Sequence, residues 1–301
     1  MDSLPLVSVC MVSYNQEEYV GEALKGVLMQ RVAFPLEVIV SDDCSTDTTS
    51  SVLKTFETEY PNIVKPIFGS KNIGYPNNLR RALESAQGKY VALCDCDDYW
   101  TDPDKLQKQV DYLESHPDCA ICFHNVLNVI ENHDEESLMN PEDFPSDLTI
   151  EDMITRKWFL PTNSEVFRRE NLSFPDWYDS VLHVDYVLNL IMAQFGYLHY
   201  MQDVMAVYRH TPQSVSVQHA DGAWGYMLFH SKTMKQILCN MQDVLELRYH
   251  SLLDQRVGYY QAEIEKYERE VYFENHLLAR LFRPKTYKRK LKRILGKWRK
   301  A

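Results

Sequence analysis

The chain has 301 residues, of which 45% are hydrophobic and 25% charged, and its formal net charge is −11. This length allows one large core, or one core with a smaller appendage. The charge is uneven, because residues 277–301 hold eleven Lys and Arg and no Asp or Glu, which leaves the rest of the chain at −22. Non-specific nucleic-acid affinity comes from neutralising phosphates, so this acidic body excludes nucleic acid as a partner.

The N-terminus and the cysteines indicate a cytoplasmic protein. The first residues lack the basic region and apolar core of a secretory signal peptide, and no apolar run is long enough to span a bilayer. The seven Cys are scattered and odd in number, which favours a reducing compartment. Cys119, Cys122 and His124 suggest a zinc site, but on a predicted strand the two sulfurs would point to opposite faces, which favours buried thiols.

In the first half of the chain, continuous apolar runs alternate with segments of helical periodicity. The runs predict strands at 6–12, 36–40, 62–68, 90–94 and 119–126, and the periodic segments predict helices near 20–28, 46–60, 79–86 and 106–113. Strands that alternate with helices in this way predict an α/β fold, in which a mixed, mostly parallel sheet is covered by helices on both faces.

The second half is divided by composition. Residues 131–147 are acidic and rich in turn formers, which predicts a loop, and a helix near 184–195 and a strand at 197–208 follow. Beyond residue 218 the pattern is helical. We therefore expect an α/β catalytic domain at 1–217, a helical region at 218–276 and a basic tail at 277–301.

The basic tail has helical periodicity. Its apolar residues Tyr287, Leu291, Ile294, Leu295 and Trp298 fall on one side, with Lys and Arg around the rest. This composition is typical of a helix that lies on an anionic membrane surface. The alternatives are docking on the protein's own acidic body or a tail without fixed structure. The membrane interpretation would hold the protein peripherally at the inner face of the cytoplasmic membrane.

Three carboxylates, Asp95, Asp97 and Asp98, follow the predicted strand at 90–94. They repel one another unless a cation lies between them. In open α/β sheets, ligands bind just beyond the carboxyl ends of the strands, where this cluster falls. Oxygen ligands suit Mg²⁺ or Mn²⁺, so the cluster predicts a divalent-metal site. The alternative is a solvated acidic turn.

Three more loops fall where a nucleotide-sugar site would need them. Residues 13–17 follow the first strand, and the ring and backbone there can pack against a base. Residues 41–47 follow the second strand, where a carboxylate can accept the imide N–H of uracil or simply cap the next helix. Residues 71–74 follow the third strand with a cation and an amide. Glycine-rich dinucleotide and P-loop motifs are not found in the sequence.

Taken in order, these segments resemble the family 2 glycosyltransferases of GT-A fold, especially those of bacterial surface-polysaccharide assembly. The resemblance covers about residues 5–217 and rests on Val9–Asn15, Val40–Asp47, Asn72–Gly74, Gly88–Tyr90, Asp95–Trp100, His183–Asp185 and Val207–His210. Seven such segments in order are far more specific than any one alone. Residues 158–164 also resemble the family's acceptor-side strand.

The resemblance implies a role for each matching residue. Asp185 would be the catalytic base, Asp97 would bind the metal that bridges the diphosphate, and Asp42 or Asp43 would hold the nucleobase. The donor site would comprise Ser13, Tyr14, Asn15, Glu17, Asp42, Asp43, Lys71, Asn72, Gly74, Asp95 and Cys96, and the metal site Asp95, Asp97, Asp98 and His210. Two departures from the family are Val184, where Glu is common, and the position of His210, which is two residues after Tyr208 rather than three.

We therefore expect a metal-dependent, inverting glycosyltransferase. It would move a hexosyl or N-acetylhexosaminyl group from a nucleotide sugar, with UDP favoured through the family, to a hydroxyl of a glycan or lipid-linked acceptor. One alternative is a catalytically silent nucleotide-sugar-binding scaffold, which the intact carboxylate set disfavours. Another is a phosphohydrolase with Asp95 as nucleophile, which the following Asp98-Tyr99-Trp100 disfavours.

Overall fold

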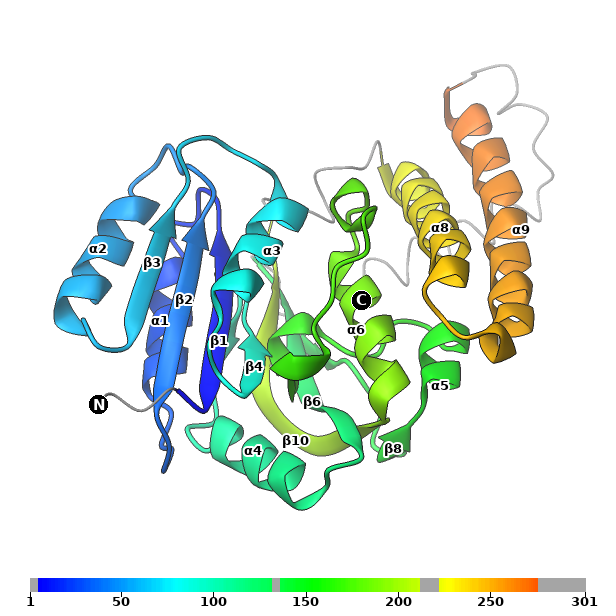
Figure 1. Cartoon of the computed structure of the whole chain (residues 1–301). Helices are drawn as coiled ribbons and strands as arrows, with labels where there is room; N and C mark the ends of the chain where they lie inside the picture. Colours follow the sequence, from blue (N-terminus) through cyan, green and yellow to red (C-terminus); the bar gives the residue numbers. More distant parts are fainter. Residues whose placement is uncertain (1–4, 132–135, 212–221, 276–301) are drawn as a thin grey trace.

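The computed structural model describes residues 5–131, 136–211 and 222–275 (Figure 1). Its centre is a 10-stranded sheet in the order β3-β2-β1-β4-β9-β6-β10-β5, with β7 paired to β6 and β8 to β10. The strands are β1 (Val7–Ser13), β2 (Leu36–Asp42), β3 (Val64–Phe68), β4 (Tyr90–Leu93), β5 (Tyr99–Trp100), β6 (Cys119–Ile130), β7 (Glu136–Leu138), β8 (Asp147–Leu148), β9 (Val166–Arg168) and β10 (Tyr197–His210).

Helices cover both faces of this sheet. They are α1 (Val20–Leu28), α2 (Thr49–Glu59), α3 (Tyr75–Ser85), α4 (Lys105–Ser115), α5 (Ile150–Thr155), α6 (Val184–Met192), α8 (Gly222–Asn240) and α9 (His250–Asn275). Because successive strand residues point to opposite faces, β1 divides its side chains between two buried clusters. Val9 and Met11 pack with α1 and α4, while Cys10 and Val12 pack with α3 and α6. The expected α/β class with a mostly parallel sheet is confirmed.

The strand directions bring the predicted site loops together. Strands β3, β2, β1 and β4 run parallel, and in register Ser13 pairs with Asp42 and Cys10 with Leu93. Their carboxyl ends therefore lie at the same rim of the sheet. Beyond β4, the short β9 runs antiparallel to both β4 and β6, and β10 runs parallel to β6. The loops after β1, β2 and β4 thus share one edge, as the sequence predicted.

Two local predictions are wrong. The stretch at 131–147 is not all loop, because Glu136–Leu138 forms β7 against β6, and Asp147 begins β8. All three residues of β7 are exposed, so this edge strand has no buried apolar pattern to reveal it. Residues 158–164 are not a strand: residues 162–164 form a 3-10 turn, in which Ser164 Oγ donates to Pro161 O at 2.7 Å.

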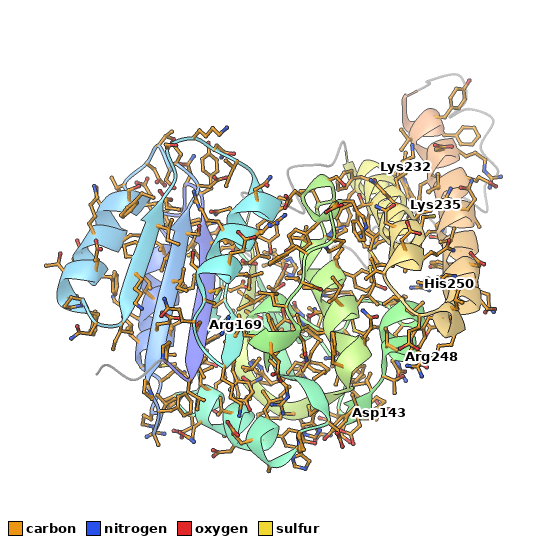
Figure 2. The ribbon with its side chains drawn as sticks, viewed as in Figure 1. Asp143, Arg169, Lys232, Lys235, Arg248 and His250 are labelled. Carbon is orange, nitrogen blue, oxygen red and sulfur yellow. The ribbon has the colours of Figure 1, made fainter. Side chains whose placement is uncertain are left out.

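The two C-terminal helices, α8 and α9, pack against the hydrophobic core of the sheet domain. Ile237 and Leu238 of α8 and Leu253 of α9 belong to the same buried cluster as Phe123 of β6. Lys232, Lys235 and His250 lie on the side of the molecule away from β3 (Figure 2). Within the ranges above, no helix is long and apolar enough to cross a membrane. The predicted membrane-binding tail, residues 277–301, lies outside the described residues.

We predict opposite effects for two glycines of α1. A Cβ on Gly26 would lie 2.8 Å from the backbone O of Trp100, whereas a Cβ on Gly21 meets nothing within 4 Å. At both positions, replacing Gly by Ala raises the intrinsic helix propensity. Gly21→Ala should therefore raise the free energy of unfolding by about 0.5–1 kcal/mol. Gly26→Ala should lower it by about 1–3 kcal/mol, because backbone cannot move aside as a side chain can. Urea denaturation measures both, and a stabilised Gly26→Ala protein would contradict the packing described here.

Candidate active site

The acidic turn after β4 concentrates negative charge in a small volume. The turn is closed by a hydrogen bond from Asp98 N to Asp95 O at 3.0 Å. Burial, followed by the charge of Asp97, raises the pKa of both Asp95 and Asp98 well above its usual range. Asp98 is 2% exposed, and its Oδ1 accepts the backbone N–H of Arg209 at 2.8 Å. Asp98 therefore ties the turn to β10, while Asp95 and Asp97 keep accessible surface.

Asp185 faces this turn from the first turn of α6. Thr162 Oγ1 donates to Asp185 Oδ2 at 3.2 Å. Burial raises the pKa of Asp185 to about 6, against the opposing effect of hydrogen bonds from the backbone and from Thr162. In turn, the charge of Asp185 contributes to the raised pKa of Asp95. The sheet rim and α6 thus form one electrostatic site, and a carboxylate that titrates near neutral pH suits a general base.

Three tyrosines that the sequence analysis missed surround these carboxylates. Burial and the charges of Asp95 and Asp185 raise the pKa of Tyr75, and burial together with all four site carboxylates raises that of Tyr208. Burial and the charge of Asp185 raise the pKa of Tyr178 as well. The three phenols are therefore neutral hydroxyl donors. Single aromatic residues carry no pattern, and only Tyr75, next to Gly74, and Tyr208, within the Val207–His210 segment, had a signal.

The carboxylates predicted to hold the nucleobase are engaged within the protein. Asp42 accepts hydrogen bonds from Ser13 Oγ at 3.1 Å and from Ser50 Oγ at 2.9 Å. Asp43 accepts the backbone N–H groups of Ile73 at 2.9 Å and Gly74 at 2.8 Å. Each carboxylate thus fixes one rim loop against another, and contact with a base stays a prediction for both.

The loop after β1 is clamped to the loop after β2 in the same way. Asn15 has φ 54°, and its Oδ1 accepts the N–H of Thr46 at 2.8 Å. Glu17 Oε2 accepts the N–H of Thr48 at 2.9 Å. These polar groups position the loops, whereas the Tyr14 side chain is 45% exposed, and its contact with a base stays a prediction.

The remaining predicted donor-site residues divide between surface and core. Lys71 and Asn72 are exposed, and Asn72 Oδ1 accepts the N–H of Gly74 at 3.1 Å. Gly74 has φ 83°, a conformation that favours glycine, and it begins α3. Cys96 is buried beneath the acidic turn, where its N–H donates to Val12 O at 3.3 Å. Only Lys71 and Asn72 of these side chains are placed to reach a ligand.

The residues fit a divalent ion that is only partly held by protein. In the described part of the chain, no three His, Cys, Asp or Glu side chains are grouped to hold a metal ion by themselves, and this includes Cys119, Cys122 and His124. Mg²⁺ and Mn²⁺ commonly take one or two carboxylates and complete their shell with water and substrate phosphates. Asp95 and Asp97, which lie on the same turn and keep accessible surface, fit that arrangement. His210 lies beside Tyr208, with 5.0 Å between ring centroids, and burial lowers its pKa.

Buried polar contacts hold the turn that donates a hydrogen bond to Asp185. Trp100 Nε1 donates to Asn163 O and Gln109 Nε2 donates to Ser164 O, each at 2.8 Å, which fixes the turn that carries Thr162. Lys105 is fully buried, with its Nζ 4.0 Å from the centroid of the Trp100 ring. Burial lowers the pKa of Lys105 to about 7. The candidate base is thus held by a chain of contacts that reaches α4 and β5.

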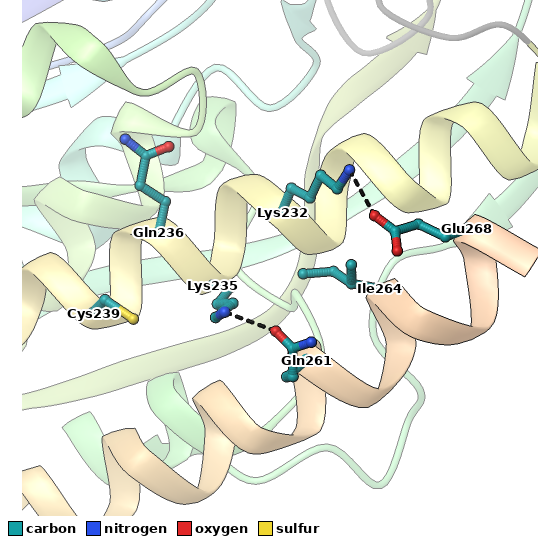
Figure 3. A pocket seen from close by; sticks show the side chains of 7 residues that line it. All are labelled: Lys232, Lys235, Gln236, Cys239, Gln261, Ile264 and Glu268. Carbon is teal, nitrogen blue, oxygen red and sulfur yellow. Dashed lines mark hydrogen bonds and ion pairs between the residues drawn. The ribbon is translucent and has the colours of Figure 1, made fainter.

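A groove elsewhere on the surface is separate from these carboxylates. It lies between α8 and α9, has a volume of about 430 Å³ and is lined by Lys232, Lys235, Gln236, Cys239, Gln261, Ile264 and Glu268 (Figure 3). Lys232 pairs with Glu268 at 3.0 Å and Lys235 donates to Gln261 at 2.7 Å. Because its polar side chains pair with one another across the groove, we assign the chemistry to the sheet rim.

Acidic loops at the carboxyl rim of a Rossmann-like sheet, facing a carboxylate on a separate helix, define a GT-A type of nucleotide-sugar site. The family profile described as Glycosyl transferase family 2 matches residues 8–172. The chain therefore belongs to glycosyl transferase family 2, which confirms the resemblance seen in the sequence.

Relatives and solved structures agree with this membership. An uncharacterised protein of Mycobacterium tuberculosis is 41% identical over 218 residues, which is 72% of this chain and 60% of that protein. The chain thus spans 60% of the length of this relative. TuaG of Bacillus subtilis, named as a teichuronic acid biosynthesis glycosyltransferase, is 39% identical over 119 residues, 40% of this chain and 46% of its own.

Two solved structures share the fold. Staphylococcus aureus TarS 1-349, in complex with UDP-GlcNAc, has a TM-score of 0.61 at 18% identity and covers 90% of this chain and 76% of its own. The mannosyltransferase PcManGT from Pyrobaculum calidifontis, in complex with GDP-Man and Mn²⁺, has a TM-score of 0.60 at 19% identity, covering 93% and 79%. At these identities the similarity concerns the fold alone.

Asp185→Asn should stabilise the metal-free protein at pH 8. The folded pKa of Asp185, about 6, lies above the ordinary value of 3.8, so its favourable contribution is complete near pH 4 and is lost as the pH rises through 6. Replacing the ionised group should raise the free energy of unfolding by about 1–3 kcal/mol at pH 8 and by much less at pH 4. Urea denaturation in chelator tests this, with the exposed Asp143→Asn as control. An equal gain at both pH values would contradict the assigned environment.

Proposed function

We propose that this protein is a metal-dependent, inverting glycosyltransferase that moves a sugar from a UDP-linked donor to a hydroxyl of a glycan or lipid-linked acceptor. The observation that carries the proposal is the electrostatic coupling of Asp185 on α6 with the acidic turn after β4. A base whose charge reaches the metal-binding turn can act on one side of a sugar while the metal acts on the other. Membership of glycosyl transferase family 2 supports the same chemistry.

On the donor side, Tyr14 and Lys71 would contact the nucleotide, because both are exposed at the rim. Asp95 and Asp97 would hold Mg²⁺ or Mn²⁺ together with the diphosphate, and Asp98 would keep their turn in place through Arg209. When bound, the ion would neutralise the charge that develops on the leaving diphosphate. The complexes of PcManGT with GDP-Man and Mn²⁺ and of TarS with UDP-GlcNAc support this arrangement by analogy of fold.

On the acceptor side, Asp185 would remove the proton of the attacking hydroxyl. The hydrogen bond from Thr162 orients the carboxylate, and the raised pKa of about 6 gives it a proton affinity suited to that step near neutral pH. Attack from the side opposite the diphosphate would invert the configuration at the anomeric carbon. Surface-polysaccharide synthesis is the pathway class that the similarity to TuaG favours.

The central test uses two substitutions at the proposed site. Asp97→Asn and Asp185→Asn should each lower turnover by at least about 100-fold, because one removes charge from the metal turn and the other removes the base. Transfer from a panel of UDP and GDP sugars to oligosaccharide acceptors measures this. Asp111→Asn, an exposed position on α4, is the matched control and should retain activity. If activity survives both site substitutions, the assignment of the site is wrong.

The basic tail gives a separate prediction for the full chain. Ending the chain after Phe282 removes ten Lys and Arg. Each basic residue near an anionic surface is worth about 1 kcal/mol, so sedimentation with anionic liposomes at low salt should fall by roughly tenfold or more. Donor hydrolysis should change little, because no predicted donor-site or catalytic residue lies in the tail. Equal liposome binding by both forms would remove the proposed membrane contact.

A further inference from the structure

Helix α8 reaches the candidate base through a pair of histidines. His230 of α8 lies with Nδ1 3.2 Å from Nε2 of His183, and the two ring centroids are 5.1 Å apart. His183 is two residues before Asp185 and immediately precedes α6. Figure 1 shows α8 passing on the α9 side of α6. The segment that carries the base is thus linked to a helix outside the part of the chain that matches the family profile.

Tyr226, one turn before His230 on α8, brings a second aromatic ring to this place. The Tyr226 and His230 rings are nearly parallel, at 23°, with centroids 6.1 Å apart. Burial and then the charge of Asp185 raise the pKa of Tyr226. The Tyr226 phenol therefore lies within electrostatic reach of Asp185. Tyr226, His230 and His183 are all half-buried, so they keep surface for a ligand.

The three side chains, which we call the α8 wall, are uncharged. Burial lowers the pKa of His183 and of His230 to about 4, so both imidazoles are neutral at physiological pH. Among the described residues, the charged groups that act on the wall are Asp185 and Arg256 of α9. Arg256 donates to Arg156 O at 3.0 Å and lies with its guanidinium 5.0 Å from the Tyr260 ring centroid. The wall therefore offers aromatic rings and neutral hydrogen-bonding atoms to a ligand. The nearby cation, Arg256, already interacts with Arg156 O and Tyr260.

Such a surface discriminates between classes of acceptor. The C–H face of a pyranose packs on aromatic rings, and its hydroxyls pair with neutral N–H and O–H groups. A phosphate or carboxylate would need Arg or Lys for charge-assisted hydrogen bonds. An anionic group would also be repelled by Asp185 and Asp95.

We propose that the α8 wall is the acceptor subsite and that it takes an uncharged sugar ring, with one hydroxyl directed at Asp185. This inference rests on the proposed glycosyltransferase function and deepens it, because it names the chemical class of the acceptor residue. Tyr226 would stack on the sugar, and the histidine pair would fix the orientation of its hydroxyls. The residues act on the acceptor alone and have no part in nucleotide binding.

The test is acceptor binding rather than turnover. Saturation-transfer NMR on the full-length protein, with Mn²⁺ and UDP or GDP, would compare methyl pyranosides with the corresponding sugar phosphates. We expect wild-type protein to bind at least one neutral pyranoside and to bind its phosphate more weakly. Tyr226→Ala and His230→Ala should weaken pyranoside binding at least tenfold, while calorimetry gives an unchanged nucleotide affinity. Tyr226→Phe, which keeps the ring, should lose less pyranoside affinity than Tyr226→Ala. Tyr272→Ala on α9 is the matched aromatic control and should bind the pyranoside as the wild type does.

Several results would overturn the proposal. They are unchanged pyranoside binding in Tyr226→Ala and His230→Ala, a preference for the sugar phosphates, or no pyranoside binding by wild-type protein that binds nucleotide. Circular dichroism of each variant separates a lost subsite from lost folding, and Tyr226→Phe keeps the test valid if the Ala variant unfolds. Wild-type protein that binds neither UDP nor GDP would instead contradict the proposed function itself.

Discussion

The repulsion among carboxylates at one rim of the sheet is the constraint on which the rest of the site depends. The parallel strands β2, β1 and β4 end side by side, so the loops that follow them lie next to one another. Asp95, Asp98 and Asp185 all have raised pKa values, each with burial as the first cause. A fold selected for stability alone would place these charges in water. Their retention at one rim is what the proposed cation-binding and proton-accepting roles would require.

The fold tolerates this charge by fixing every segment that carries it. Asp98 is held by the N–H of Arg209, and Asp185 by the hydroxyl of Thr162. Beneath them, Glu165 is fully buried beside the side chain of Asn189. Burial and the charge of Asp185 raise the pKa of Glu165, which therefore stays protonated and adds no charge below the base. The rigidity of the site comes from neutral and backbone partners, which leave its negative charge available to a cation.

The sequence predicted those parts of the fold that depend on apolar burial. Continuous runs located β1, β2 and β4, and hence the rim, because a strand buried on both faces must be apolar throughout. Strand β7 was not predicted because its residues are exposed, and β9 was not predicted because it has only three residues. The meeting of Asp95 with Asp185 came only from the family resemblance, since no periodicity links positions 90 residues apart. Sequence also cannot show which polar atoms pair internally, so only the structure shows that Asn15 and Glu17 clamp loops, and their contact with a donor stays a prediction.

The division of the chain suggests how such an enzyme can change acceptor without losing its donor. The family profile ends at residue 172, so it contains the rim loops but neither Asp185 nor α8. The rim is cross-linked by backbone and carboxylate hydrogen bonds, and a substitution there disturbs several loops at once. His230 of α8 contacts the base segment through His183, whereas Ile237 and Leu238, further along the helix, belong to the core. Variation confined to α8 can therefore alter which hydroxyl reaches Asp185 while the geometry of the metal turn stays intact. Under the two proposals, the donor chemistry would belong to the rim loops, and the choice of acceptor would belong to side chains of α8.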